Sequence, residues 1–263
     1  MYRTDRQRIQ NEIGSELDQW SKVGWVAKFF WRDDDAVTDT PALRRLFQVA
    51  RDKGITVALA VIPEQADAAL ARLLTTETCC VWQHGWNHRW YERGEFGDGR
   101  PLEAMKYDAL SGQRRMDQLF GPQGWQRIFV PPFHEIAMPF KALLSVLGYL
   151  GVSAGVPPTP RIEGVPELNA FDFMDWKAKK LLPESEIYAL ILEELKSRRA
   201  GSIPAARPIG LLTHHLVMDE QDWSVLSDLF SLLQSHEASH VCSAFEVFAS
   251  PKLQDAILDG FPH

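Results

Sequence analysis

The stretch VAKFFWRDDDA, residues 26–36, joins an apolar and aromatic run directly to four consecutive charged side chains. A run such as Val26 to Trp31 is typical of a buried parallel strand that reaches the rim of a sheet or barrel, where polar residues begin. The sequence therefore predicts a buried strand whose carboxyl end presents the three carboxylates of Asp33, Asp34 and Asp35.

Apolar runs and amphipathic stretches alternate along the rest of the chain at intervals of roughly 25 to 40 residues, which implies βαβ units and a parallel sheet. Because polar residues follow several of the strands, we favour a barrel, whose mouth collects them, over an open doubly wound sheet. We expect one α/β domain over residues 1–263, a distorted (β/α) barrel of seven or eight mostly parallel strands. Besides residues 26–31, strands are expected at 55–61, 79–83, 127–130, 152–154, 168–173, 209–213 and near 240, with a loop at 157–166. Helices are expected at 5–20 (the N-terminal segment 1–22, packed on the barrel), 41–53, from 64, 102–120, 141–149, 184–199 and 221–234.

Composition limits the classes of function. The net charge is −7 with no basic block, which argues against a nucleic-acid partner. Three cysteines, Cys79, Cys80 and Cys242, do not form a disulfide framework and are expected to be buried free thiols. The N-terminal stretch MYRTDRQRIQNEIGSEL is polar, and no run of about 18 apolar residues occurs, so we expect a cytoplasmic protein without a membrane partner.

The three adjacent aspartates need a physical reason, because like charges a few ångströms apart repel and raise one another's pKa. A metal ion or a shared proton would relieve this repulsion. A solvated acidic loop, or a helix N-cap before Thr40-Pro41, would give the same pattern, so the aspartates alone do not decide between these readings.

A histidine pair, His84 and His88 in QHGWNH, follows another expected strand. Two imidazoles four positions apart lie on one face if the segment is helical and can then bind one metal; alone, they are equally a pair of surface histidines. Joined with an aspartate, they form a two-histidine, one-carboxylate set that leaves open positions, as a catalytic zinc site requires.

In this order the motifs resemble the polysaccharide deacetylase family (NodB-homology domain), which includes chitin, chitooligosaccharide and peptidoglycan deacetylases. The resemblance covers residues 29–215. It implies that Asp34 is the general base, that Asp35 is a metal ligand, and that His84 and His88 are the remaining protein ligands. Asp33 leaves this register open by one residue; in the favoured register its substitution is expected to be nearly silent.

The third family motif is matched by FVPPFHE, in which Pro132 and Phe133 would line the substrate groove and a backbone N–H near Phe133 would face the oxyanion. Val130 stands where the family has an arginine that restrains the base. Either Arg32 supplies that restraint, or the base is less tuned than in the family.

The fourth and fifth motifs resemble FDFMDWK and LLTHH. They imply that His214 is the general acid, that Asp175 orients it, and that Trp176 walls the acetyl pocket. Taken alone, each segment is more often a strand end with core residues. Trp86 is a further candidate for stacking on a sugar. His134 and His215 receive no role from the sequence.

The resemblance implies a hydrolase that removes an N-acetyl or related acyl group from an amino sugar or sugar-like molecule, with a metal-activated water, an aspartate base and a histidine acid. The expected cofactor is a divalent metal, Zn²⁺ first, with Co²⁺, Ni²⁺ or Mn²⁺ as alternatives. The expected partner is a carbohydrate or another N-acylated small molecule. Two other readings stay open: a catalytically silent, metal-containing carbohydrate-binding barrel, and a non-haem iron oxygenase.

Overall fold

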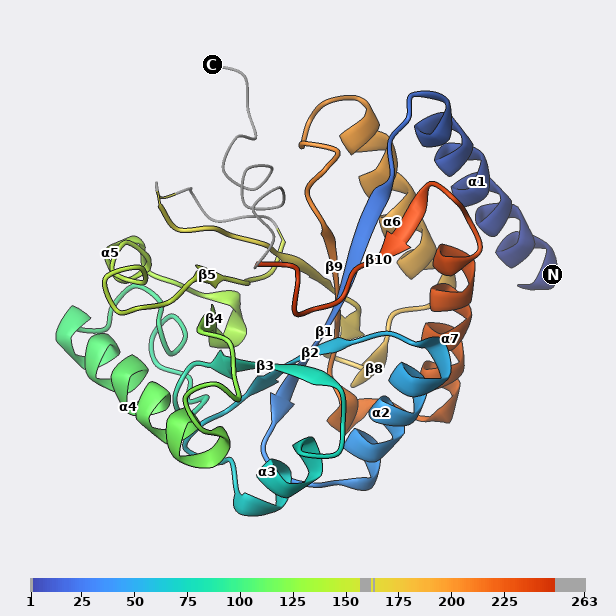
Figure 1. Cartoon of the computed structure of the whole chain (residues 1–263). Coiled ribbons are helices and arrows are strands. Elements are labelled where there is room, and N and C mark those ends of the chain that lie inside the picture. Colours follow the sequence, from blue (N-terminus) through green and yellow to red (C-terminus); the bar gives the residue numbers. More distant parts are fainter. Residues whose placement is uncertain (1, 157–161, 163, 249–263) are drawn as a thin grey trace.

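Eight parallel strands form the wall of a barrel in the computed structural model, which describes residues 2–156, 162 and 164–248 (Figure 1). Seven follow one path in the order β5-β4-β3-β2-β1-β9-β6, and β10 pairs with the start of β1. This confirms the expected barrel of seven or eight mostly parallel strands. The strands are β1 (Ala27–Ala36), β2 (Val57–Val61), β3 (Cys79–His84), β4 (Ile128–Val130), β5 (Gly151–Val152), β6 (Ala170–Asp172), β9 (Ile209–Thr213) and β10 (Ser239–Val241).

The two end strands of this path, β5 and β6, come together through the chain that flanks them. Leu168 N donates to Val152 O at 3.0 Å, and Ala170 N donates to Ala154 O at 3.0 Å. These bonds close the sheet on itself, so the carboxyl ends of the seven strands on this path surround one opening.

The central strand β1 is longer than expected, because it continues through the three aspartates to Ala36. Its pairing with β2 shifts register between Asp33 and Ala36, and Asp35 takes a left-handed backbone (φ 71°) at this irregularity. Successive side chains of a strand point to opposite faces. Arg32 and Asp34 therefore share the barrel interior with Phe30, whereas Asp33 lies on the outer face.

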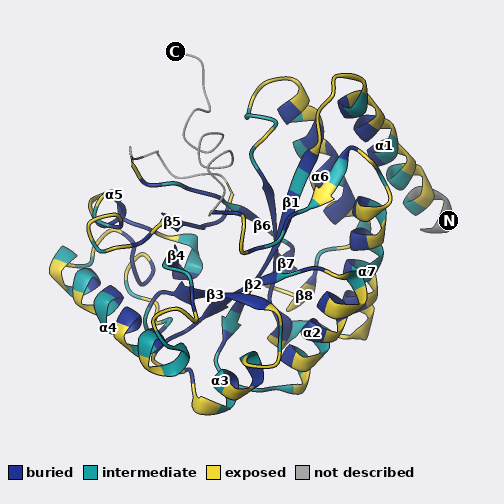
Figure 2. Cartoon of the chain, viewed as in Figure 1, coloured by how far each residue is buried: buried dark blue, intermediate teal, exposed yellow. Residues whose placement is uncertain are grey.

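Seven helices lie outside the sheet within the described residues, and their buried sides point inward, toward the sheet or toward a neighbouring helix (Figure 2). Helix α1 packs on α6, where Ile13, Leu17 and Trp20 are fully buried and Trp20 Nε1 donates to Leu195 O. The helices are α1 (Tyr2–Lys22), α2 (Pro41–Lys53), α3 (Ala68–Leu74), α4 (Leu102–Phe120), α5 (Met138–Lys141), α6 (Glu184–Arg199) and α7 (Glu220–Gln234).

Local structure departs from expectation in three places. Helix α3 begins at Ala68 rather than near residue 64, because Asp67 caps it. The helix expected at 141–149 is replaced by α5 and a series of turns, in which hydrogen bonds such as Leu143 N to Phe140 O reach back only three residues. A small hairpin, β7 (Met174–Asp175) and β8 (Lys180–Leu181), was not predicted.

In the expected loop at 157–166, residues 157–161 and 163 lie outside the described part. Among the described residues, no helix combines the length and the apolar character that crossing a membrane requires.

Candidate active site

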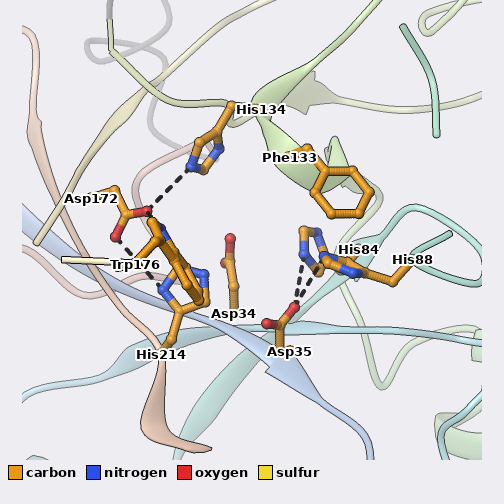
Figure 3. Close-up of a pocket in the computed structure, with 9 residues that line it drawn as sticks. All are labelled: Asp34, Asp35, His84, His88, Phe133, His134, Asp172, Trp176 and His214. Atoms are coloured by element: carbon orange, nitrogen blue, oxygen red, sulfur yellow. Dashed lines mark hydrogen bonds and ion pairs between the residues drawn. The ribbon is translucent and has the colours of Figure 1, made fainter. Parts of the chain in front are cut away.

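A cavity of about 420 Å³ opens where β1, β3, β6 and β9 end, beside the loop that follows β4 (Figure 3). Most of its polar side chains belong to segments that the sequence singled out. They come from distant parts of the chain and meet because parallel strands end at the same rim. The lining residues are Asp34, Asp35, His84, His88, Phe133, His134, Asp172, Trp176 and His214.

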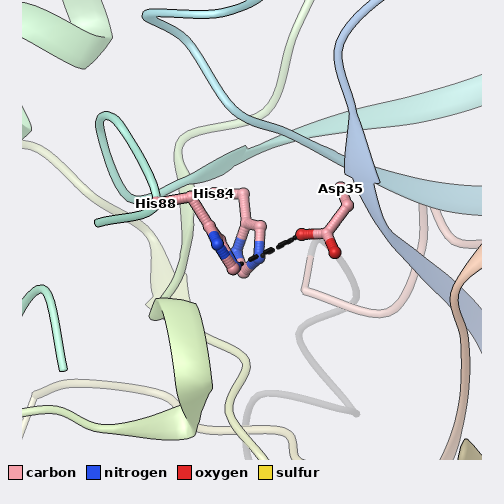
Figure 4. A group of neighbouring side chains, drawn as sticks. All are labelled: Asp35, His84 and His88. Carbon is pink, nitrogen blue, oxygen red and sulfur yellow. Dashed lines mark ion pairs between the residues drawn. The ribbon is translucent and has the colours of Figure 1, made fainter. Parts of the chain in front are cut away.

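Three possible metal ligands converge on one side of this cavity (Figure 4). Asp35 Oδ1 lies 3.2 Å from His84 Nε2 and 3.3 Å from His88 Nε2. In a tetrahedral zinc site, atoms about 2.0–2.1 Å from the ion lie about 3.3 Å from one another. The spacing of Asp35 from the two imidazoles therefore suits a shared cation.

The tautomer of His84 gives a second reason to place a cation here. His84 Nδ1 lies 3.0 Å from Val130 O, and a carbonyl only accepts, so Nδ1 carries the proton. In the neutral ring, Nε2 then points a lone pair at Asp35 Oδ1, which is buried and accepts no hydrogen bond from the residues that the structure describes. Two lone pairs at this distance repel unless positive charge lies between them, so the donor set fits a divalent metal ion.

The ionisation states of these groups agree with a ligand role. Burial, together with the charge of His84, lowers the pKa of His88 to about 4, so its imidazole is neutral near pH 7. Burial opposes ionisation of Asp35, but its contacts with His84 and His88 prevail and hold its pKa well below the usual range. Burial would also lower the pKa of His84, yet the charges of Asp34 and Asp35 raise it. A bound cation would displace the proton that this raised pKa favours.

Asp34 is almost fully buried at the floor of the cavity and is held by Arg32. Arg32 Nη2 donates to Asp34 Oδ2 at 3.0 Å, and Nε lies 2.9 Å from Oδ1. Arg32 Nη1 in turn donates to the carbonyl and hydroxyl of Ser153 and to Ala154 O. The restraint that the sequence left open at Val130 thus comes from the same strand that carries Asp34.

Asp33 does not line the cavity. Its fully buried carboxylate accepts hydrogen bonds from Thr213 Oγ1 at 2.6 Å and from His215 N at 3.0 Å, and it lies 2.5 Å from His215 Nδ1. Asp33 thereby holds the end of β9 from which His214 projects. The expectation that substitution of Asp33 leaves metal binding and turnover nearly unchanged stays a prediction, whereas the buried network gives Asp33 a structural role and gives His215 a structural partner.

The opposite wall of the cavity is organised by Asp172. His214 Nδ1 lies 3.7 Å from Asp172 Oδ1, and His134 Nε2 lies 3.8 Å from Oδ2. Trp176 Nε1 donates to Oδ2 at 2.8 Å, and its ring meets that of His214 at 4.6 Å in an edge-on contact. Burial opposes ionisation of Asp172, but these neighbours lower its pKa.

The pairing of Asp175 with His214 needs correction. Asp175 Oδ1 accepts from Lys177 N and Ala178 N, both at 3.0 Å, in the turn between β7 and β8. Asp172, three residues earlier in FDFMDWK, is the carboxylate that faces His214. A signal existed in the sequence, since Asp172 ends an expected strand, where barrel enzymes place their polar groups.

Two expected substrate contacts also lie elsewhere. Neither Pro132 nor Trp86 is among the cavity-lining residues: Pro132 is buried and packs against Gly85. Besides Trp176, which lines the cavity, an exposed aromatic residue next to it is Trp90, which is 62% exposed and meets Phe133 at 4.9 Å. Phe133 lies against His88 at 4.4 Å, as a cavity wall.

Backbone strain is concentrated around the cavity. Five described residues other than glycine have a left-handed backbone, and four of them line the cavity: Asp35, His88, Phe133 and His134, with φ of 71°, 57°, 60° and 61°. Such conformations are uncommon outside glycine and persist where the surrounding structure enforces them, often at functional sites. Their position agrees with a site at which orientation of side chains matters.

The fold is shared with solved structures at low sequence identity. A protein from Mycobacterium smegmatis named as a polysaccharide deacetylase is 14% identical, with a TM-score of 0.65 over 88% of this chain and 91% of that one. A family 4 acetyl xylan esterase from Clostridium thermocellum, solved with a cobalt ion, is 14% identical, with a TM-score of 0.55 over 84% and 90% of the two chains.

A family 4 carbohydrate esterase from Streptomyces lividans, solved with acetate, is 14% identical, with a TM-score of 0.53 over 86% of this chain and 94% of that one. No protein-family model matches the sequence, and no curated protein matches it. The chain therefore has the fold of polysaccharide deacetylases and family 4 carbohydrate esterases, and the cavity lies at the carboxyl ends of that barrel's strands.

Proposed function

We propose that this protein is a divalent-metal-dependent hydrolase of the polysaccharide deacetylase type, which removes an acetyl or related acyl group from an amide on a sugar or sugar-like molecule. One observation carries the proposal. A two-histidine, one-carboxylate cluster, a restrained carboxylate and a carboxylate-held histidine all face the same cavity.

Asp35, His84 and His88 would hold the metal, for which Zn²⁺ is the first candidate and Co²⁺, Ni²⁺ and Mn²⁺ are alternatives. When bound, such an ion activates water and polarises a carbonyl group. Val130 O orients His84, and the strained backbone at Asp35 turns its carboxylate toward both imidazoles.

Asp34 acts as the general base and takes a proton from the attacking water. Its ion pair with Arg32 fixes the carboxylate within the cavity, so the carboxylate is already oriented when substrate binds. The water oxygen forms the new bond to the acyl carbon. Because Pro131 and Pro132 have no N–H, Phe133 supplies the first backbone donor of this loop toward the developing oxyanion, an interaction typically worth roughly 3 kcal/mol.

His214 acts as the general acid and gives a proton to the leaving nitrogen as the C–N bond breaks. Asp172 stabilises the imidazolium form, and the edge of Trp176 restricts the ring. The products are the carboxylic acid and a free amine. Trp176 and Phe133 lie on opposite sides of the cavity and bound the space for the acyl group (Figure 3).

The cavity volume of about 420 Å³ lies in the lower part of the range of about 300–1,000 Å³ that is typical of small-molecule sites. We therefore place one acylated sugar residue, or a molecule of similar size, inside it. Further residues of an oligomer would extend past the mouth, next to Trp90.

Acetate release tests this proposal. Metal-free protein is reloaded with Zn²⁺ or Co²⁺ and assayed with N-acetylated monosaccharides, short N-acetylated oligomers and O-acetylated xylo-oligomers, with Asp34→Asn as the inactive control. Metal-dependent release from an N-acetylated sugar supports the proposal. Release from the O-acetylated set alone would replace the amide by an ester as substrate.

The other two readings predict different results in the same assay. A silent carbohydrate-binding barrel would bind metal and sugar without releasing acetate from any compound. An iron oxygenase would consume oxygen with Fe²⁺, a reaction that gives no role to the Arg32–Asp34 pair or to the Asp172–His214 pair.

A further inference from the structure

A buried glutamate that no catalytic role requires lies directly behind the metal cluster. Glu95 is fully buried, and its carboxylate accepts hydrogen bonds from three successive backbone N–H groups. Oε1 accepts from Trp86 N at 3.1 Å and from Asn87 N at 2.8 Å, and Oε2 accepts from His88 N at 3.0 Å. The last of these bonds is made to the backbone of a proposed metal ligand.

The loop that supplies these donors has an unusual backbone. Gly85 and His88 are both left-handed, with φ of 55° and 57°. Successive N–H groups that point the same way form a concave site for an anion, and here a side chain of the protein fills it. Burial raises the pKa of Glu95, while the three backbone N–H groups oppose that shift by favouring the charged form.

The position of Glu95 is itself fixed. Arg100 Nη1 donates to Glu95 O at 2.7 Å, and Arg100 is held by an ion pair with Asp108 at 2.8 Å. A Cβ atom at Gly85 would lie 2.5 Å from Glu95 Oε2, so the loop backbone can approach the carboxylate only because residue 85 is glycine.

The three proposed ligands differ in how the fold supports them. Asp35 and His84 belong to strands β1 and β3, whereas His88 lies in a loop beyond the end of β3. A strand holds its side chains through the sheet, but the loop needs another restraint. The carboxylate of Glu95 binds the N–H groups of Trp86, Asn87 and His88, whereas Glu64 N and Gln65 Nε2 hold only the carbonyl groups of the two residues before His88.

We propose that Glu95 is a positioning residue that holds the loop at residues 85–88 in its metal-binding conformation before the ion arrives. The inference rests on the proposed metal-dependent function and assigns a further residue to it. Glu95 touches neither substrate nor metal. It acts through the backbone of His88, so its loss weakens the metal site while the ligands themselves remain.

The test compares Glu95→Gln with the wild type and with Glu92→Gln, an exposed glutamate three residues away on the same segment. Glutamine removes the charge and brings its NH₂ group against at least one backbone N–H, so at least one of the three bonds is lost. Competition titration of metal-free protein with Zn²⁺ and Co²⁺ is expected to give about 10- to 100-fold weaker binding for Glu95→Gln, the usual effect of losing a partner behind a ligand. Glu92→Gln should bind like the wild type.

Hydrogen–deuterium exchange of metal-free protein gives a second readout, which does not depend on metal binding. The amides of Trp86, Asn87 and His88 are expected to exchange slowly without metal, and to exchange faster in Glu95→Gln. Fast exchange of these amides in the wild type would overturn the inference.

Unchanged metal affinity in a folded Glu95→Gln protein would also overturn it, and would leave the proposed function intact. Absence of metal binding by the wild type itself would remove the proposed function and this inference together.

Discussion

The three adjacent aspartates have three different surroundings, although the sequence presents them as one acidic run. Asp34 faces the cavity in an ion pair with Arg32, and Asp35 faces His84 and His88. Asp33 points to the other side of β1 and holds the end of β9. The period of two along a strand separates Asp33 from Asp34, and the left-handed backbone turns Asp35 back toward the cavity.

Substitution of the two cavity aspartates separates the base from the ligand. Asp34→Asn should keep the metal and lose activity by about 10²-fold or more, because an amide cannot take a proton from water. Asp35→Asn should lose metal and activity together, since a neutral ligand no longer attracts the cation. Metal analysis and acetate release on the same samples check both results. Retention of metal by Asp35→Asn with its loss from Asp34→Asn would move the register by one residue.

Asp33→Asn tests the buried network instead. An asparagine can keep an oxygen toward Thr213 and His215 N, but it then places an uncharged NH₂ group where Oδ1 now faces His215 Nδ1, so about 1–3 kcal/mol of unfolding free energy should be lost. Urea unfolding of metal-free protein measures this loss, with Asp98→Asn at an exposed position as the control. Equal stability of the two variants would show that the network contributes nothing.

At the level of elements, the sequence predicted the barrel well because its strands are continuous apolar runs between helices with clear ends. Helix α2 spans residues 41–53 as expected, with Thr40 as its N-cap and Gly54 at its end. The helix expected at 141–149 was wrong because apolar periodicity in the run from Leu143 to Tyr149 does not distinguish a helix from successive turns packed on a core. The hairpin β7–β8 has strands of two residues, too short for a periodic signal.

The residues that motifs at strand ends singled out and that line the cavity are Asp34, Asp35, His84, His88 and His214, and their roles stay predictions. Contacts were missed where they join segments that no local pattern connects. The contact of Asp172 with His214 depends on how the barrel closes, and that of Glu95 with the loop at 85–88 depends on how the segment after β3 folds. The Arg32–Asp34 pair was one of the two alternatives that the sequence left open.

Two aspartates of the FDFMDWK segment occupy different elements. Asp172 ends β6 and faces His214, whereas Asp175 caps a turn of the hairpin. Asp172→Asn should lower turnover of an amide substrate by about tenfold or more, because the imidazolium of His214 loses its stabilising charge. Asp175→Asn should change turnover little. The reverse order of effects in steady-state kinetics would restore Asp175 as the partner of His214.

The fold buries all three cysteines as free thiols, which confirms the expectation from the sequence. Burial raises the pKa of Cys79 to about 12 and that of Cys242 to about 11, and raises the pKa of Cys80 as well. Since the thiolate is the reactive form, the folded protein should resist iodoacetamide at pH 8. Mass spectrometry should find all three sites labelled only after unfolding; rapid labelling of the native protein would contradict this packing.

The metal content of the wild type and of two histidine variants tests the proposed metal site most directly. We expect purified wild-type protein, after dialysis against Zn²⁺, to hold one ion per chain. His84→Ala and His88→Ala should each lose it or bind it far more weakly while keeping the wild-type circular dichroism spectrum, because the cluster lies at the rim of the barrel. Full metal occupancy in both folded variants would contradict the account, since the ion would then be held by residues other than Asp35, His84 and His88.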